Sequence, residues 1–492
     1  MTFEEEIVLL LKAKSPLISI LSSEEERVEY ALRKLMTTKL NRVVYSWDYV
    51  NGFTPNILNE TCKRNPFEAL FKIRNIHDQV PSLILFKDFD NFLCDLSISR
   101  EIKNLLPFLR KQPKTLIFLN EQNTLPKSIF NMFVFVEFRL PNIYEIKNEI
   151  KRLNKSLDLK VEEKLIELLV SSFQGLSLEK IRHLLAKVIA SKKHLDFSTI
   201  NIILDEKSQL ISKTEILEFW KPEENFTSIG GLNNLKSWLT KRKLHFSESA
   251  KNYRLTTPKG VLLVGVQGTG KSMTAKAIAN DWGLPLLRLD IGRLFGGVVG
   301  ESEKKVREMI DITESLAPCL LWIDEIEKSF ANTSQFGDSG TTNRMLSTLL
   351  TWLAEKKPFV FIVATANALE MVQLELIRKG RFDEIFFLDL PNTNERKIIF
   401  EIHLKSFRPE SWATYNIQEL SELTSSFSGA EIKQLIIEAM YQAFSEGREF
   451  KTEDIIKEID TTIPLAKFNQ ESILTLQNWL RSGRIRPASA DF

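Results

Sequence analysis

The sequence predicts an α/β protein built from two successive α/β domains, the second of which ends in a helical subdomain. Three observations support this prediction. Short apolar runs alternate with segments in which apolar residues recur every three or four positions, as strands and amphipathic helices do. One apolar run, Val261–Val264, leads directly into the glycine-rich stretch GVQGTGKS. The same order of short motifs occurs twice along the chain, which is typical of a duplicated module.

Composition narrows the class of protein. Of the 492 residues, 43% are hydrophobic and 26% are charged, as in globular proteins. A net charge of +2 gives no general affinity for nucleic acid. Cys62, Cys94 and Cys319 are far apart and form no metal-binding spacing, so we expect a reducing compartment. No apolar run approaches the ~18 residues of a membrane span, and the start, MTFEEEIVLL, lacks the features of a transit or secretory peptide.

Residues 1–205 are predicted to form the first domain. Alternating strands and helices favour a parallel sheet. The expected strands are Leu17–Leu21, Val43–Ser46, Leu83–Phe86 and Thr115–Leu119. The expected helices include Glu24–Met36, Ile143–Asn154 and Glu162–Ser172. Residues 206–225 are charged and mixed, and we interpret them as a connector.

The second domain is predicted over residues 226–393, followed by a helical subdomain over 394–464 and a tail over 465–492. The expected strands are Val261–Val264, Leu284–Leu289, Leu320–Ile323, Phe359–Ala364 and Glu384–Leu388. Helical periodicity dominates from Glu395 to about Glu458. The basic tail sequence NWLRSGRIRPAS is interpreted as a solvated terminus packed by Trp479, with a partner-binding arm as the alternative.

The duplication is visible in four motifs that occur in the same order in both halves. Apolar runs end at Asp88 and at Asp324, and later runs are followed by Asn120 and Asn367. The triplet Leu-Pro-Asn and the pattern SSFxG then follow at similar separations. The first copy has Ser22, Ser23 and three glutamates where a phosphate loop would stand, so we expect no ATP hydrolysis there.

The stretch GVQGTGKS fits the pattern G-x-x-x-x-G-K-[ST] of a phosphate-binding loop. Glycines allow a tight turn that aims successive N–H groups at phosphate oxygens, and the following helix directs its positive end at the same anion. Lys271 adds a cation for the β- and γ-phosphates of ATP, and Ser272 supplies a hydroxyl ligand for Mg²⁺. The residues expected around the nucleotide are Gly265, Val266, Gln267, Gly268, Thr269, Gly270, Lys271, Ser272 and Met273.

Three further segments supply residues suited to phosphoryl transfer. Asp324 and Glu325 follow a buried-strand run, where Asp324 suits Mg²⁺ binding and Glu325 suits general-base activation of water. Asn367, at the end of another strand, can orient the same water. Arg378 and Arg381 offer planar donors for the charge that develops on the phosphate, although alone they would be read as surface ion-pair partners.

Six motifs in order resemble the AAA clade of the AAA+ ATPases. They are IGGL (229–232), GVQGTGKS, LLWIDE, ATAN, IRKGRFDE and FSGAEI (427–432), spread over about residues 226–465. The resemblance implies a parallel five-stranded P-loop sheet in a large ATPase subdomain with a C-terminal helical lid. It also makes residues 1–205 a degenerate AAA-like domain without a P-loop.

The resemblance implies further roles. Ile229, Gly230, Gly429 and Ala430 would lie around the nucleotide base and ribose, and Asn367 would sense the water. Arg378 and Arg381 match the arginine fingers that reach the ATP of a neighbouring subunit, which implies a homo-oligomeric ring, by analogy a hexamer. The full layout is similar to AAA-domain proteins encoded in algal plastid genomes and in cyanobacteria, which favours the plastid stroma, with the cytoplasm of a prokaryote as the alternative.

One departure from the family concerns Val298, which occupies the position of the aromatic pore residue that threading relatives use to grip polypeptide. We therefore weigh three functions: an ATP-hydrolysing ring that remodels a protein partner, a nucleotide-dependent switch or scaffold with slow hydrolysis, and a nucleic-acid remodelling ATPase. Neutral charge and the lack of interleaved aromatic and basic residues weigh against nucleic acid. The sequence does not name the client protein.

Overall fold

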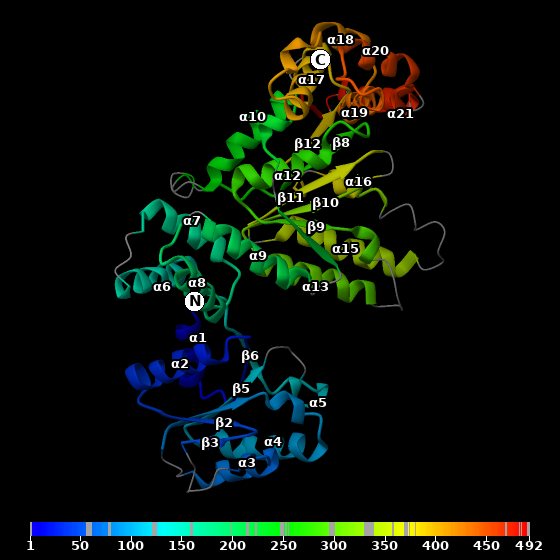
Figure 1. Cartoon of the computed structure of the whole chain (residues 1–492). Coiled ribbons are helices and arrows are strands. Elements are labelled where there is room, and N and C mark those ends of the chain that lie inside the picture. The colour runs from blue at the N-terminus through cyan, green and yellow to red at the C-terminus, as the bar shows by residue number, and fades with distance from the viewer. Residues whose placement is uncertain are drawn as a thin grey trace. The chain divides into compact units, whose positions relative to one another are not determined.

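The computed structural model divides the chain into two compact units (Figure 1). Residues 1–160 and 176–195 form the first, and residues 161–175 and 196–492 form the second. The structure describes residues 2–489 apart from 56–61, 77–79, 121–124, 158–160, 197, 213–215, 222–223, 247–249, 251–252, 254, 295–300, 329–338, 357–358, 369–371, 373, 379, 468–469, 482 and 484. Val298 therefore lies outside the described residues. Among the described helices, none combines the length and apolar character needed to span a membrane.

The first unit is built on a six-stranded sheet in the order β3-β2-β4-β5-β1-β6. All neighbouring strands are parallel except β3, which runs antiparallel to β2 at the edge. The strands are β1 (Leu17–Leu21), β2 (Val43–Asp48), β3 (Gly52–Thr54), β4 (Ser82–Lys87), β5 (Lys114–Asn120) and β6 (Val134–Glu137). The four strands predicted for this half are thus present, and β3 and β6 are additional.

Helices cover both faces of this sheet because buried strands in a parallel sheet present apolar residues to both sides. Side chains of α1 and α2 pack with Ile18 and Ile20 on one face. Side chains of α3 and α4 pack with Leu17 and Phe86 on the other. The helices of the unit are α1 (Phe3–Lys12), α2 (Glu25–Leu35), α3 (Pro66–Lys72), α4 (Leu96–Leu109), α5 (Lys127–Phe130), α6 (Ile143–Ser156) and α8 (Leu178–Lys192).

The second unit contains a seven-stranded sheet in the order β13-β12-β8-β11-β10-β9-β7. Its five central strands are parallel and correspond to the five that the sequence predicts. The strands are β7 (Leu217–Trp220), β8 (Gly260–Gly265), β9 (Leu286–Leu289), β10 (Cys319–Ile323), β11 (Val360–Ala366), β12 (Glu384–Leu388) and β13 (Arg486–Pro487).

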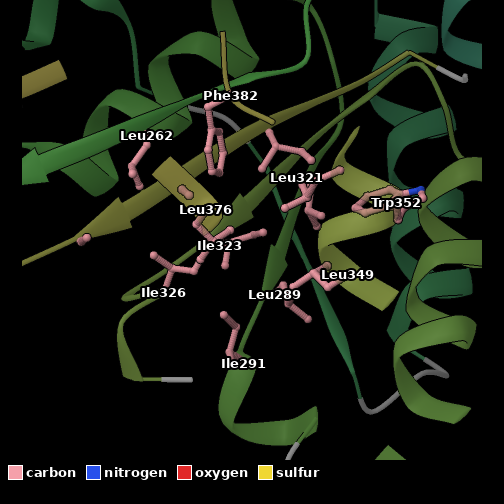
Figure 2. Close-up of a cluster of buried hydrophobic side chains, with 14 of the residues drawn as sticks. Leu262, Leu289, Ile291, Leu321, Ile323, Ile326, Leu349, Trp352, Leu376 and Phe382 are labelled. Atoms are coloured by element: carbon pink, nitrogen blue, oxygen red, sulfur yellow. The ribbon is translucent and has the colours of Figure 1, made fainter. Parts of the chain in front are cut away.

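Two apolar clusters lie on the two faces of this sheet. Figure 2 shows one of them, in which Leu321 and Ile323 of β10 lie near Leu349 and Trp352 of α15. On the opposite face, α10 and α12 contribute residues such as Leu235 to the second cluster. The helices of the α/β part are α7 (Glu163–Phe173), α9 (Ser198–Ser212), α10 (Asn233–Lys243), α12 (Lys271–Trp282), α13 (Glu301–Ser315), α15 (Ser339–Glu355) and α16 (Leu374–Ile377).

The predicted helical lid follows β12 and has its own apolar core, which includes Phe400, Leu435 and Ile455. Its helices are α17 (Thr393–Phe407), α18 (Ile417–Leu423), α19 (Gly429–Ser445) and α20 (Thr452–Thr461), whereas α21 (Gln470–Arg481) lies in the predicted tail and packs Leu476 into a cluster of the sheet. Helix α19 begins with Ser428 as its N-cap, at the second SSFxG motif.

Strand order supports the predicted duplication. In each half, the first five parallel strands along the chain are arranged second, third, fourth, first, fifth, and an antiparallel strand flanks the second; the second half adds β13, parallel to β12, at its other edge. The Leu-Pro-Asn motifs also play the same part, because Asn142 and Asn392 each begin a helix with a capping box completed by Glu145 and Glu395. The shared local chemistry makes coincidence a poor explanation of the repeated motifs.

The segments interpreted as a connector and a solvated tail contain regular structure that the sequence did not predict. Residues 206–225 include the end of α9 and all of β7, which pairs with β9 at the sheet edge. The tail adds β13 to β12, and Ala488 is fully buried. The predicted solvated terminus is therefore wrong for Ile485 and Ala488, which are buried, while Arg486 is exposed, and the five-stranded sheet has two further edge strands.

Candidate active site

The phosphate-loop sequence connects β8 to α12 at the carboxyl edge of the second sheet. Strand β8 lies between β11 and β12, so the loop emerges at the centre of a buried sheet. Gly265 passes so close to β12 that a Cβ there would lie 2.1 Å from the carbonyl oxygen of Leu388. Gly268 and Gly270 adopt φ values of +85° and +91°, which favour glycine. These glycines explain the motif physically, because other residues would strain this turn.

Lys271 begins α12 and lies buried beneath the loop. Its Nζ donates to the carbonyl oxygens of Gly265 and Val266, each at 2.8 Å. Burial lowers the pKa of Lys271 to about 8, against the opposing effect of Glu327, Asp324 and Glu325. The ammonium group is thus held by carbonyl oxygens of the loop itself, and an anionic phosphate bound there would stabilise the charged form that burial disfavours.

Asp324 and Glu325 follow β10 and are both positioned by the hydroxyl of Thr365 on β11. That hydroxyl donates to Asp324 Oδ1 at 2.7 Å and accepts from the Glu325 N–H at 3.0 Å. Glu325 has a left-handed φ of +48°, which is uncommon for a residue with a Cβ. Ile323, before Asp324, and Ile326, after Glu325, belong to the buried cluster shown in Figure 2, which anchors the turn between them.

Asn367 lies at the end of β11, beside the same turn. Its Nδ2 donates to Glu325 Oε1 at 3.2 Å, and its N–H donates to Glu327 Oε1 at 2.9 Å. Lys328 forms an ion pair with the Glu325 carboxylate. The structure therefore brings the predicted water-sensing amide into direct contact with the predicted general base.

A polar cavity of about 320 Å³ opens beside these acids. It is lined by Arg288, Asp290, Ile291, Gly292, Asp324, Glu325 and Lys328. Arg288 comes from β9 and lies 3.4 Å from both Asp324 and Glu218. The cavity is thus lined by the carboxylates of Asp324 and Glu325 and by the cations Arg288 and Lys328. A site for a metal ion and an anionic phosphate needs groups of both charges.

The predicted base-binding residues also meet in the structure. A Cβ on Gly230 would lie 2.6 Å from Ile399, and one on Gly429 would lie 3.6 Å from the same side chain. The N–H of Ala430, at the start of α19, donates to the carbonyl oxygen of Gly268 at 3.1 Å. The Ile229 loop therefore meets the lid at Ile399, and the lid meets the phosphate loop at Ala430.

Arg378 and Arg381 are the predicted residues that the structure does not bring to the phosphate loop. They precede β12, and Gly380 between them accepts a hydrogen bond from Nζ of Lys259, the residue just before β8. Because β8 and β12 are parallel, this end of the sheet lies roughly 13 Å along the strands from the loop. Arg378 is exposed, and Nη1 of Arg381 is buried without a hydrogen-bond partner among the described residues.

The residues present fit a magnesium nucleotide. The loop offers backbone donors in glycine conformations that a Cβ would strain, with Lys271 behind them. Ser272 stands in the first turn of α12, and Asp324 has one carboxylate oxygen engaged by Thr365 and the other 3.4 Å from Arg288. An oxygen ligand set of hydroxyl, carboxylate and phosphate is the kind that Mg²⁺ prefers.

The first unit places a buried carboxylate near the end of β1, the strand equivalent to β8. After β1 comes Glu24, which is 7% exposed and accepts the N–H of Leu178 at the start of α8 at 2.6 Å. Arg27 forms an ion pair with Glu24 and donates to Glu145 at 2.8 Å. The helix N-terminus that Glu24 occupies is therefore that of α8, the counterpart of lid helix α19, whereas its side chain makes no capping hydrogen bond to α2, the helix that follows β1.

Sequence reasoning missed several residues that shape the site. Thr365 stood within the predicted ATAN motif but had no role, and Arg288 and Glu327 gave no recognisable signal. Glu395 is a capping-box residue whose side chain also reaches the Ile229 loop, where Leu232 N–H donates to it at 3.3 Å. The spacing Thr-x-Asn at the end of a strand could have suggested the role of Thr365. The contacts of Arg288, Glu327 and Glu395 join elements that are distant in sequence, so no local pattern indicates them.

Comparison with known families agrees with this geometry. Residues 261–390 match the ATPase family associated with various cellular activities (AAA), and residues 414–458 match the AAA+ lid domain. Residues 3–138 match the N-terminal domain of SpoVK-like AAA ATPases, and residues 144–214 match their second domain.

Relatives extend over the whole chain. The AAA domain-containing protein ycf46 of Trieres chinensis is 53% identical over 491 residues, which cover 100% of this chain and 99% of that protein. Its counterpart in Guillardia theta is 49% identical and covers 99% of this chain and 97% of that protein. A proteasome-activating nucleotidase of Saccharolobus islandicus is 35% identical over 56% of this chain and 71% of its own length. The chain therefore belongs to the AAA ATPase family and, within it, to the ycf46 AAA domain-containing proteins.

Proposed function

We propose that the protein is a magnesium-dependent ATP hydrolase that works as a homo-oligomeric ring and uses turnover to remodel a protein partner. The observation that carries this proposal is the convergence of Lys271, Asp324, Glu325 and Asn367 at one edge of the second sheet. Two of these residues, Glu325 and Asn367, are in direct contact, and Thr365 holds both acids. A site for binding alone would not require a carboxylate oriented in this way.

Binding is assigned to the loop and to the lid together. Backbone N–H groups of residues 265–272 and the ammonium of Lys271 would hold the phosphates. Ile229, Gly230, Gly429 and Ala430 would surround the base and ribose. Ser272 and Asp324 would hold Mg²⁺, whose charge, when bound, offsets that of the phosphates.

The chemical step is assigned to Glu325, with Asn367 as the residue that orients it. Glu325 would take a proton from water as the water oxygen bonds to the terminal phosphorus and the bond from that phosphorus to the bridging oxygen breaks, which releases ADP. Asn367, which donates to Oε1 of Glu325, would fix the direction of that carboxylate. Lys328 pairs with Glu325 in the structure, so this ion pair would have to loosen for Glu325 to act as a base.

Arg378 and Arg381 are assigned to the site of a neighbouring subunit. Their position at the far edge of the sheet separates them from the phosphate loop of their own chain. An arginine supplied in trans contributes roughly 10³–10⁵ in rate in related phosphoryl-transfer enzymes, so turnover would depend on assembly, with a hexamer as the expected ring.

A protein client is favoured over nucleic acid by the neutral charge of the chain and by its similarity to a proteasome-activating nucleotidase. A location in the plastid stroma follows from the resemblance to plastid-encoded AAA-domain proteins. The second candidate, a nucleotide switch or scaffold with slow hydrolysis, is favoured by Val298 at the position where threading relatives carry an aromatic residue.

The Glu325→Gln variant tests the proposal. We expect it to bind ATP with the affinity of the parent protein and to lose turnover, because the amide cannot accept the proton. Turnover by the variant at the parent rate would show that the assigned base is wrong. If the parent protein itself bound ATP and assembled but turned over less than about one ATP per chain in an hour, the switch would be the better description.

A further inference from the structure

We infer that the C-terminal strap, residues 485–489, positions the loop that holds the nucleotide base, and that Ser489 does so through Glu395. This inference rests on the proposed function, since it concerns the Ile229–Leu232 loop of the same site. The strap belongs to the folded core: Arg486 and Pro487 pair with β12, and the Ala488 N–H donates to the carbonyl oxygen of Phe387 at 2.9 Å.

The strap caps helix α10 from a distance. The residue before the helix is Leu232, which has a left-handed φ of +57° and no side chain that can accept a hydrogen bond. The carbonyl oxygen of Ala488 accepts the N–H groups of Asn234 and Leu235 at 3.0 and 3.1 Å instead. The side chain of Asn234 donates in turn to the carbonyl oxygen of Ser489 at 2.7 Å. Donors at the helix start that need a partner thus receive it from the strap.

The strap also reaches the base-binding loop through a shared carboxylate. Oε1 of Glu395 accepts the Ser489 hydroxyl at 2.6 Å and the Leu232 N–H at 3.3 Å. Oε2 of the same side chain accepts the Asn392 N–H at 3.1 Å, which fixes the carboxylate at the start of the lid helix α17. One side chain therefore joins the lid, the strap and the loop.

Two glycines in the loop allow this approach. At Gly231, φ is +69° and a Cβ would lie 2.1 Å from Oε1 of Glu395. At Gly230, a Cβ would lie 2.6 Å from Ile399. The loop is thus pressed against α17, and its position depends on where Glu395 points. Ser489 is a positioning residue in this arrangement, because it orients the carboxylate and touches no nucleotide.

The test compares ligands that do and do not reach the loop. ADP and ATP carry a base, whereas inorganic tripolyphosphate can use only the phosphate loop and Mg²⁺. For Ser489→Ala we expect the Kd of ADP and ATP to rise about three- to tenfold, the loss expected for one hydrogen bond, with the Kd of tripolyphosphate unchanged. The KM for ATP should rise while kcat stays the same. Ser489→Thr, which keeps the hydroxyl, should restore the parent values.

Ser445→Ala is the matched control, because Ser445 is an exposed lid serine whose hydroxyl donates only within its own helix, to Gln442. It should change no Kd. Unchanged ADP and ATP affinity in Ser489→Ala would overturn the inference, and so would an equal loss for tripolyphosphate, which would indicate a merely structural strap. A parent protein that bound tripolyphosphate and ADP but never hydrolysed ATP would contradict the proposed hydrolase while leaving this inference intact. A parent that bound none of the three would refute the proposed nucleotide site itself.

Discussion

Replacing Thr365 with valine should uncouple ATP binding from ATP hydrolysis. Thr365 is 1% exposed, and its hydroxyl both donates to Asp324 and accepts from the Glu325 backbone. Valine has nearly the same shape but can make neither hydrogen bond. The substitution therefore removes the clamp on the two acids while leaving the phosphate loop and its lysine unchanged.

The magnitude follows from the two hydrogen bonds. A bond to a charged group contributes about 1.5–3 kcal/mol and a neutral one about 0.5–1.5 kcal/mol. The turn at Glu325 also stays in a left-handed conformation that costs on the order of 1 kcal/mol or more. We take about 2 kcal/mol of this total as lost stabilisation of the transition state, because the two acids are no longer held in place. Since each ~1.4 kcal/mol is a factor of ten in rate, kcat should then fall roughly 30-fold.

Steady-state turnover and nucleotide titration, measured on the same preparation, separate the two effects. We expect a 10- to 100-fold loss of kcat by these principles, with a Kd for ATP within about threefold of the parent value. Thr365→Ser is the matched control, because it keeps the hydroxyl and removes only a methyl group at a cost of about 1 kcal/mol in unfolding free energy. A valine variant with the parent kcat would refute the assigned role of Thr365.

The remaining predictions concern the subunit contact and the lid. Arg381→Ala should keep ATP affinity and lower turnover roughly 10³-fold or more, and mixing it with Lys271→Ala protein should restore part of the activity in shared sites; no recovery in mixed rings would contradict a trans arginine. In the lid, Arg448 donates two hydrogen bonds to Asp454, at 2.6 and 2.8 Å, and these lower the pKa of Asp454 to about 2. Because that pKa is below the ordinary value near 3.9, the stabilisation is complete above about pH 5 and is lost as the pH falls toward 2. Asp454→Asn should therefore lower the unfolding free energy by about 1–2 kcal/mol at pH 7, allowing for the exposed guanidinium, with the difference from the parent vanishing near pH 2 in chemical denaturation.

Much of the fold followed from local patterns in the sequence. The five central strands of the second sheet are continuous apolar runs, and such runs predict buried parallel strands wherever helical segments alternate with them. The phosphate loop was equally predictable, because its glycines are required by backbone conformation and its lysine by charge. The repeated Leu-Pro-Asn motifs marked two helix starts with the same capping chemistry.

What the sequence could not indicate are contacts between distant segments. Strand β13 has only two residues, Arg486 and Pro487, which is too short for any periodicity, and it exists because β12 offers an open edge. Helix α10 begins after Leu232, an unsuitable cap, because the carbonyl of Ala488 serves in its place. The role of Thr365 likewise depends on the pairing of β11 with β10, which composition does not reveal.

We infer that each chain holds one nucleotide, bound at the phosphate loop of the second half. Titration of the purified protein with MgATP is the most direct measurement of this claim, with binding stoichiometry determined for the parent and for Lys271→Ala. We expect one ATP per chain in the parent protein and none in the variant, because the first half has Ser22, Ser23 and three glutamates where a phosphate loop would stand. Two sites in the parent, or one site that survives in Lys271→Ala, would contradict it.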